Sequence, residues 1–317
     1  MKKLFFIIFL ISTTNLLLSQ QQTNYTQFFS NEVIFNPAVS GSKAYNPLVL
    51  QTRQQWLGFD GAPISSSISY HKLIDQNNAF GGILNIEQTN PSMKIDLQTA
   101  YAFHIPLNSN RTFLSFGLAP SFMYYSINFD LEDLPENRDP AFSASTYSSA
   151  SFDLASGVYL YNESLSLGVS CVNMLQSSFD GEVLVQSNQT VGKSSFGRNL
   201  RERIFYSLIS YKFDIINNDW QFEPIILSRN FNNQSFVTDF VTKIKYLKNN
   251  WISLGYRTDA TSSFGFGFKA NKLHIGYSYD YQLSSSIMNH NFGTHEIVLS
   301  FYIPAFQHNR HTNFWLF

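Results

Sequence analysis

Alternation with a period of two residues recurs along this chain and limits its fold more than any other feature. Residues 273–282 place Leu, Ile and three Tyr on one side, with His, Gly, Ser, Asp and Gln between them. The same pattern appears at 94–105, 164–170 and 264–269. Because successive side chains of an extended strand point to opposite faces, this pattern predicts β-strands with one apolar and one polar face.

The composition of the two faces indicates a membrane-spanning sheet. Aromatic residues form 16% of the chain and charged residues 14%, and many polar-face positions are Gly, Ser or Ala. Aromatic residues also gather near segment ends, as in the girdles of transmembrane barrels. Beyond the N-terminal segment, no apolar run approaches the ~20 residues of a spanning helix. We therefore expect an all-β fold, a transmembrane antiparallel β-barrel in the outer membrane.

The segments that alternate number about 14, an even number as in bacterial single-chain barrels. Short turns are expected at 77–78 and 248–250, and long loops at 128–151 and 176–203. The candidate strands centre near Thr52, Ser69, Leu84, Thr99, Gly117, Ala155, Leu167, Leu208, Glu223, Phe240, Gly255, Phe266, Tyr277 and Leu299.

The N-terminus is typical of a secretory signal peptide. Lys2 and Lys3 precede an apolar run at 4–11, and small or polar residues end the segment near Ser19 and Gln20. An N-terminal membrane anchor is the alternative, but the polar residues at 12–15 leave the run too short to span as a helix. We expect cleavage after Ser19 or Gln20.

Three units follow from this prediction. Residues 1–20 are the signal peptide, residues 21–306 form the barrel with a short N-terminal periplasmic segment, and residues 307–317 form a C-terminal tail.

Composition and motifs argue against several functions. The 21 basic and 22 acidic residues leave no net attraction for nucleic acid, and the single Cys171 excludes an internal disulfide. No G-x-S-x-G, P-loop or EF-hand motif occurs, and His308 and His311 have no neighbouring carboxylate or Cys to complete a metal site. We expect no catalytic residues, no bound metal, no cofactor and no enzymatic activity. His104 and His274 fall on polar faces, where a histidine bonded to its lumen neighbours is expected.

Motifs read in chain order carry a family resemblance. Residues 25–29 read Tyr-Thr-Gln-Phe-Phe, residues 35–41 read Phe-Asn-Pro-Ala-Val-Ser-Gly, and residues 53–63 read Arg-Gln-Gln-Trp-Leu-Gly-Phe-Asp-Gly-Ala-Pro. Later segments that fit are 101–105, 255–260, 275–280 and 293–297. In this order and spacing they resemble the PorP/SprF family of type IX secretion system outer-membrane proteins, from about Thr23 to Ile303.

The resemblance singles out residues for a structural or partner-docking role. One interpretation is that they fix barrel closure, and the other is that they form a docking surface. Opposite charges at strand ends also suggest an ion pair between Glu296 and either Arg53 or Arg257. The family-motif positions are Asn36, Pro37, Arg53, Trp56, Gly58, Phe59, Gly61, Pro63, Gly255, Tyr256, Arg257, Tyr277, Tyr279, Asp280, His295 and Glu296.

The resemblance implies a non-enzymatic component of the type IX secretion and gliding machinery. Such a protein supports export and surface attachment of a large adhesin with a C-terminal sorting domain. Its expected partners are outer-membrane lipid, that adhesin and periplasmic components of the secretion system. The alternatives are a passive channel or hydrophobic-solute transporter, since a barrel of this size is either open or plugged, and an outer-membrane hydrolase, for which no catalytic constellation is found.

Overall fold

The computed structural model describes most of the chain. The described residues are 23–107, 112–128, 146–179, 182–187, 190–195, 200–215, 219–231, 236–247, 249–283 and 291–304. The predicted signal peptide and the predicted tail at 307–317 lie outside them.

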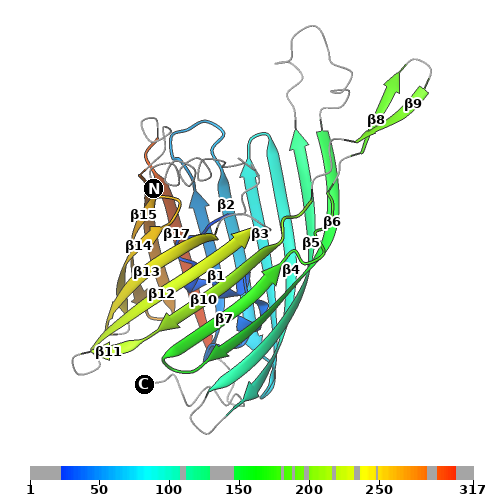
Figure 1. The fold of residues 1–317 in the computed structure, drawn as a ribbon. Helices are drawn as coiled ribbons and strands as arrows, with labels where there is room; N and C mark the ends of the chain where they lie inside the picture. Colours follow the sequence, from blue (N-terminus) through cyan, green and yellow to red (C-terminus); the bar gives the residue numbers. More distant parts are fainter. Residues whose placement is uncertain are drawn as a thin grey trace, which may run out of the picture.

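Three 3₁₀ turns precede a series of antiparallel strands (Figure 1). The turns are η1 (Phe28–Ser30), η2 (Glu32–Ile34) and η3 (Pro37–Val39). The strands are β1 (Tyr45–Gln54), β2 (Ile64–Leu73), β3 (Asn78–Thr89), β4 (Ser92–Pro106), β5 (Phe113–Asn128), β6 (Thr146–Tyr161), β7 (Leu165–Val172), β8 (Glu182–Ser187), β9 (Thr190–Ser195), β10 (Ile204–Tyr211), β11 (Phe213–Ile215), β12 (Trp220–Phe231), β13 (Phe236–Tyr246), β14 (Asn250–Arg257), β15 (Thr261–Ala270), β16 (Leu273–Gln282) and β17 (Thr294–Pro304).

The main sheet closes on itself because β1 pairs with β17 and β10 pairs with β12. The short β11 continues the line of β10 along β12, so the result is a closed barrel of 14 strands. The interruption between β10 and β11 lies opposite Pro224 of β12. A proline has no N–H to donate to a sheet ladder, which accounts for the break there.

Each predicted strand centre falls inside an observed strand. One element was not expected: β8 and β9 form a separate two-stranded hairpin within the predicted long loop 176–203. Most of the other predicted loop, residues 129–145, lies outside the described residues. No helix among the described residues is long and apolar enough to cross a membrane.

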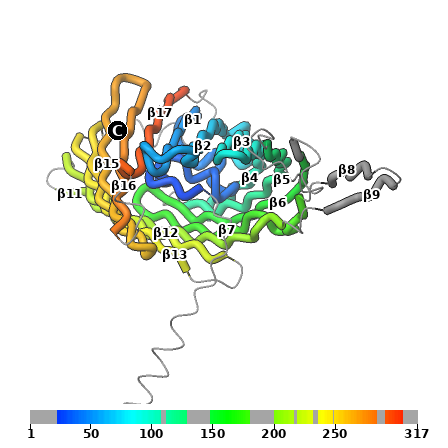
Figure 2. The backbone as a smooth tube through the Cα atoms, turned by 90° about the horizontal axis from the view of Figure 1, so that it is seen from above, coloured from blue at the N-terminus to red at the C-terminus, as the bar shows by residue number. Residues whose placement is uncertain are grey.

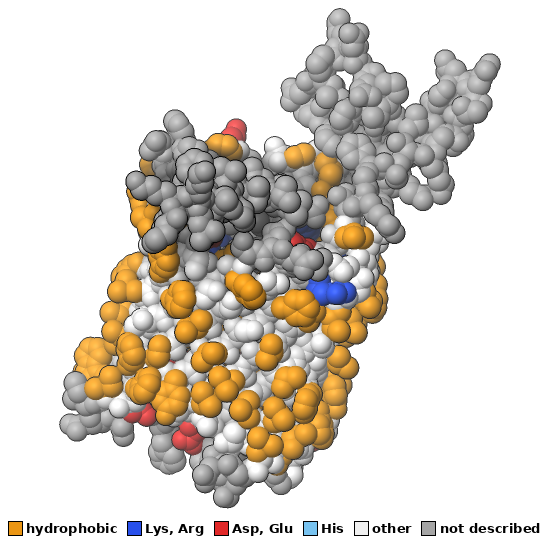
Figure 3. Space-filling model, in the orientation of Figure 1, with side chains coloured by type: hydrophobic (Ala, Val, Ile, Leu, Met, Phe, Trp, Pro, Cys, Tyr) orange, Lys and Arg blue, Asp and Glu red, His pale blue; other side chains and the backbone are white. Residues whose placement is uncertain are grey.

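The wall of the barrel is apolar outside and polar inside. In β5, buried and exposed residues alternate almost without interruption, and Phe116, Leu118 and Phe122 on the outer face are each about half exposed. Figure 3 shows hydrophobic side chains spread over this outer wall. The buried face holds serines, histidines and charged residues. This arrangement matches a lipid-facing exterior and a polar interior.

The two ends of the barrel differ in their connections. The short turns 74–77, 162–164 and 271–272 lie at one end, which we call the short-turn end. The connections 55–63 and 173–203 lie at the other, the long-loop end. Outer-membrane barrels have short periplasmic turns and longer external loops, so the short-turn end faces the periplasm.

The segment before β1 lies inside the barrel, whereas the sequence led us to expect a short periplasmic segment. Residues 23–43, which we call the plug, appear within the ring of strands when the barrel is viewed along its axis (Figure 2). Gln27, Ala38 and Ser40 have no measurable solvent exposure. The plug lies in the lumen because its polar groups hydrogen-bond to the inner face of the wall and its apolar side chains pack against it.

Candidate functional site: the plugged lumen

The plug runs the length of the lumen. At the long-loop end, the Thr23 hydroxyl donates to Glu87 Oε1 of β3 at 2.6 Å. At the short-turn end, the Ser40 carbonyl lies 2.8 Å from His104 Nε2 of β4, and the chain then enters the wall at Tyr45. The plug therefore descends from the outer to the periplasmic end before the first strand begins.

A buried arginine holds the outer part of the plug. Arg53 near the end of β1 places Nη2 2.7 Å from Asp280 Oδ2 and Nη1 3.2 Å from Glu296 Oε2. The same Nη1 donates to the Thr26 hydroxyl at 2.8 Å, and that hydroxyl donates to Asp280 Oδ2 at 2.6 Å. Three neighbouring strands of the closure, β1, β16 and β17, thus meet at one plug residue.

Glu296 binds the plug backbone directly. Its Oε2 accepts the Thr26 N–H and its Oε1 accepts the Gln27 N–H, both at 2.8 Å. Gln51 Nε2 adds a further donor to Oε1 at 3.0 Å. A buried carboxylate needs several donors to replace lost water. The plug supplies two of them, so the bound plug helps to stabilise the buried charge of Glu296.

A second ionic cluster lies on the neighbouring wall. Asp239 of β13 accepts from Arg257 Nε at 2.6 Å and also from Arg229 Nη2 of β12. Arg229 Nη1 in turn donates to the Asn24 side chain of the plug at 2.7 Å. Across the two clusters, Arg53, Arg229 and Arg257 are matched by the three carboxylates of Asp239, Asp280 and Glu296, so the buried charges balance.

Asn36 fixes the middle of the plug. Its Oδ1 caps η3 by accepting the Ala38 N–H at 3.0 Å, and its Nδ2 donates to the Val158 carbonyl of β6 at 3.2 Å. A Cβ at Gly157 would lie 2.1 Å from Asn36 Oδ1, and one at Gly117 would lie 2.2 Å from the Ala38 nitrogen. Glycine at these two wall positions provides the space that the plug occupies.

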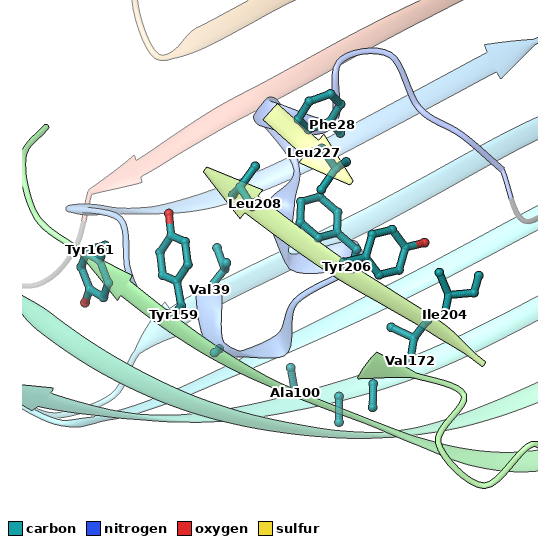
Figure 4. Packing of buried hydrophobic residues seen from close by; sticks show 14 of the residues in the cluster. Phe28, Val39, Ala100, Tyr159, Tyr161, Val172, Ile204, Tyr206, Leu208 and Leu227 are labelled. Carbon is teal, nitrogen blue, oxygen red and sulfur yellow. The ribbon is translucent and has the colours of Figure 1, made fainter. Parts of the chain in front are cut away.

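Apolar contacts fill the remaining space between plug and wall. Phe28 and Val39 of the plug belong to one buried cluster with Tyr206, Leu208 and Leu227 of the wall (Figure 4). The Phe35 ring stacks on Tyr206 with centroids 5.3 Å apart. Burial also raises the pKa of the Tyr25 hydroxyl in the plug, so this group stays neutral.

Two histidines, His71 and His104, hold the plug at the short-turn end of the barrel. The Gly41 N–H donates to His71 Nδ1 at 3.0 Å, and His104 bridges the Ser40 carbonyl and the Tyr161 hydroxyl, which lies 2.9 Å from Nδ1. The expectation that His104 bonds to lumen neighbours is confirmed. His274 does so as well, since its Nδ1 lies 3.2 Å from the Tyr302 hydroxyl.

Comparison with known proteins identifies the family of this plugged barrel. A family model described as type IX secretion system membrane protein PorP/SprF matches residues 17–301. The chain belongs to this family. No curated protein matches the sequence significantly.

Solved structures share the fold. The structure is similar to the CymD monoaromatic hydrocarbon channel, with a TM-score of 0.51 and 12% identity, covering 88% of this chain and 94% of that chain. It is also similar to the Pseudomonas putida toluene transporter TodX, with a TM-score of 0.46 and 10% identity, covering 85% and 91%. At such low identity the likeness shows the barrel fold alone. The family match and the barrel fold shared with CymD together place this PorP/SprF protein in the cell outer membrane.

The PorP/SprF motif residues fall into separate groups in the structure. Arg53, Asp280 and Glu296 form the first ionic cluster, and Arg257 joins the second. The suggested ion pair therefore exists with Arg53, while Arg257 pairs with Asp239 instead of Glu296.

The motif residues of the plug lie inside the lumen, and those of β14 lie in the wall. Asn36 and Pro37 begin η3 inside the lumen. Gly255 packs beside Ser263 and Val241, and Tyr256 on the outer face is about half exposed.

A third group of motif residues shapes the long-loop end. Trp56, Gly58 and Gly61 in the β1–β2 loop have positive φ angles of 46°, 91° and 73°. The Gln55 N–H donates to the Pro63 carbonyl at 2.9 Å and closes the loop, while Phe59 is half exposed. This loop joins the β16–β17 connection, because the Leu57 N–H donates to the Gly293 carbonyl at 2.8 Å.

A fourth group lies on the outer wall near that junction. The Tyr277 hydroxyl lies 2.7 Å from His295 Nδ1, and the Tyr279 ring makes an edge contact with the same imidazole at 5.3 Å between centroids. The structure thus brings Tyr277, Tyr279 and His295 together, away from the ionic clusters.

Sequence reasoning missed several hydrogen-bond partners of these clusters, both in the plug and on the wall. Thr26 and Gln27 lie within the motif at 25–29, which was the available signal, but Asn24, Gln51 and Arg229 carried none. Within the described ranges, no group of three or more His, Cys, Asp and Glu side chains is placed to hold a metal ion.

Replacing Arg53 tests the first cluster. Arg53→Met leaves two buried carboxylates without their cation, so we expect a loss of about 3–5 kcal/mol of folding free energy. Adding Asp280→Asn and Glu296→Gln to Arg53→Met removes the unpaired charges and is expected to recover much of that loss. The measurement is urea unfolding of the barrel in detergent or lipid vesicles.

The matched control for Arg53→Met is Lys72→Met, since Lys72 is an exposed cation on β2. This change is expected to alter stability by no more than about 0.5 kcal/mol. Equal effects of the two substitutions would contradict the importance of the cluster.

Proposed function

We propose that this PorP/SprF protein is a non-enzymatic component of the type IX secretion and gliding machinery in the outer membrane. It supports export and surface attachment of a large adhesin with a C-terminal sorting domain, and it contacts periplasmic partners of the machinery. The family match supports the secretion part of the proposal. The adhesin and the periplasmic partners follow from the family resemblance.

The observation that carries the proposal is the filled lumen. The plug is bonded to the wall at both ends, through Glu296 near the outside and His104 near the periplasm. A passive channel needs an open path, and this path is occupied by residues 23–43. Contacts with other proteins at the two ends of the barrel are then the more suitable mode of action.

The long-loop end offers a docking surface for the exported partner. Phe59 and Phe292 are 50% and 73% exposed on two loops that are bonded to each other. Exposed aromatic side chains on a rigid support are typical anchors of protein interfaces. We assign the docking role among the motif residues to Trp56 and Phe59, and a structural role to Arg53, Asp280 and Glu296.

A clean deletion tests the secretion role. Surface-exposed and secreted proteins of the deletion strain are compared with the parent by mass spectrometry. We expect one large adhesin to leave the cell surface while other sorted cargo persists. Loss of all sorted cargo would indicate a core part of the machine, and no change in any cargo would contradict the proposal.

Complementation separates docking from folding. In the deletion strain, Phe59→Ser is expected to give a normally folded barrel without returning the adhesin to the cell surface. Ile68→Ser on the lipid-facing wall is the matched control and is expected to give both a folded barrel and a surface adhesin.

Conductance measurements test the channel alternative. In planar bilayers the intact protein is expected to conduct no steady current, because the plug fills the lumen. A variant without residues 23–42 is expected to open a water-filled path of a polar-lined barrel. Steady conductance or solute flux through the intact protein would favour the channel or hydrophobic-solute transporter.

A further inference from the structure

A cavity of about 100 Å³ lies beside the outer end of the plug. Its walls come from the plug, from β3 to β5, and from the connection between β7 and β10. Thr23, Asn85, Asp96 and Arg201 line its polar side, and Met123 and Phe179 belong to its apolar side.

Three polar atoms at this cavity are buried without a hydrogen-bond partner among the described residues. They are Asn85 Oδ1, Asp96 Oδ1 and Arg201 Nη1. Arg201 is only 6% exposed, and its other nitrogens already bond to Asn173 and Asp96, each at 3.0 Å. Unmet buried groups are costly and rare in folded proteins, so a donor and an acceptor are expected in this space.

The described part of the plug begins at this cavity. Thr23, the first described residue, lines the cavity, and its backbone N–H donates to Glu87 Oε1 at 3.3 Å. The residues immediately before it are Gln20, Gln21 and Gln22. If the predicted signal is removed after Ser19 or Gln20, only two or three glutamines precede Thr23, and they span at most about 7–10 Å.

We infer that this cavity binds the first residues of the processed chain, Gln20–Gln22 or Gln21–Gln22. A glutamine side chain carries both an amide donor and a carbonyl acceptor. The donor suits the oxygens of Asn85 and Asp96, and the acceptor suits Arg201 Nη1. The inference depends on the predicted cleavage, since a retained signal continues the chain by a further 19 or 20 residues and leaves no chain end in the cavity.

A double-mutant cycle tests this assignment in the full protein. The glutamines at 20–22 are changed together to Ala, in the natural background and with Asn85→Ala. Mass spectrometry first reads the N-terminus of each exported protein. The measured quantity is the unfolding rate of the barrel in denaturant, and the gel mobility of the folded form is used to monitor it. Gln221→Ala, at the other end of the barrel, provides the matched control background, since Gln221 Nε2 donates to Asp214 of β11.

The glutamine replacement is expected to accelerate unfolding roughly 5- to 30-fold, as the loss of one or two hydrogen bonds produces. In the Asn85→Ala background part of this acceleration should disappear, because one of the three partners is already gone. In the Gln221→Ala background it should persist in full. An unchanged unfolding rate, equal acceleration in the natural and Asn85→Ala backgrounds, or an N-terminus elsewhere than residue 20 or 21 would overturn the inference.

Discussion

The contact of Arg53 with two buried carboxylates is the interaction on which the lumen depends. Asp280 and Glu296 come from the strands that close the barrel, and neither is exposed to water that could stabilise its charge. Arg53 supplies one cation for two anions. Further donors come from the plug, through the backbone N–H groups of Thr26 and Gln27 and the Thr26 hydroxyl, and from the Gln51 side chain of the wall. Closure of the wall and binding of the plug therefore depend on the same two buried carboxylates.

This arrangement explains why the family motifs are spread over the whole chain. Residues near 25, 53, 280 and 296 are far apart in sequence but meet at the seam between β1 and β17. Other motif residues shape the loop junction at the outer end, where Phe59 is exposed. The motifs thus include an internal set that holds the plug, a set that shapes the loop junction, and a set on the outer face of the wall. A closed barrel with a shaped rim suits a secretion component that acts through protein contacts.

Much of the wall could be predicted from the sequence, because alternation is a local signal. The strands around Thr99, Phe266 and Tyr277 have one aromatic face and one small or polar face, and the structure puts the first on the outside of the barrel. The plug could not be predicted in the same way. Its 3₁₀ turns have no periodicity, and its position depends on distant residues such as Gly157, which leaves room for Asn36. The expected ion pair was found with Arg53, whereas the choice between Arg53 and Arg257 required the register of the strands.

Hydrogen exchange of the plug backbone tests the central claim most directly. The folded barrel in detergent is incubated in deuterated water, and peptides covering residues 24–42 are followed by mass spectrometry beside peptides from β17 and from the turn 74–77. A plug bonded to the wall exchanges as slowly as β17. Exchange of residues 24–42 as fast as that of the exposed turn would contradict a plug held in the lumen.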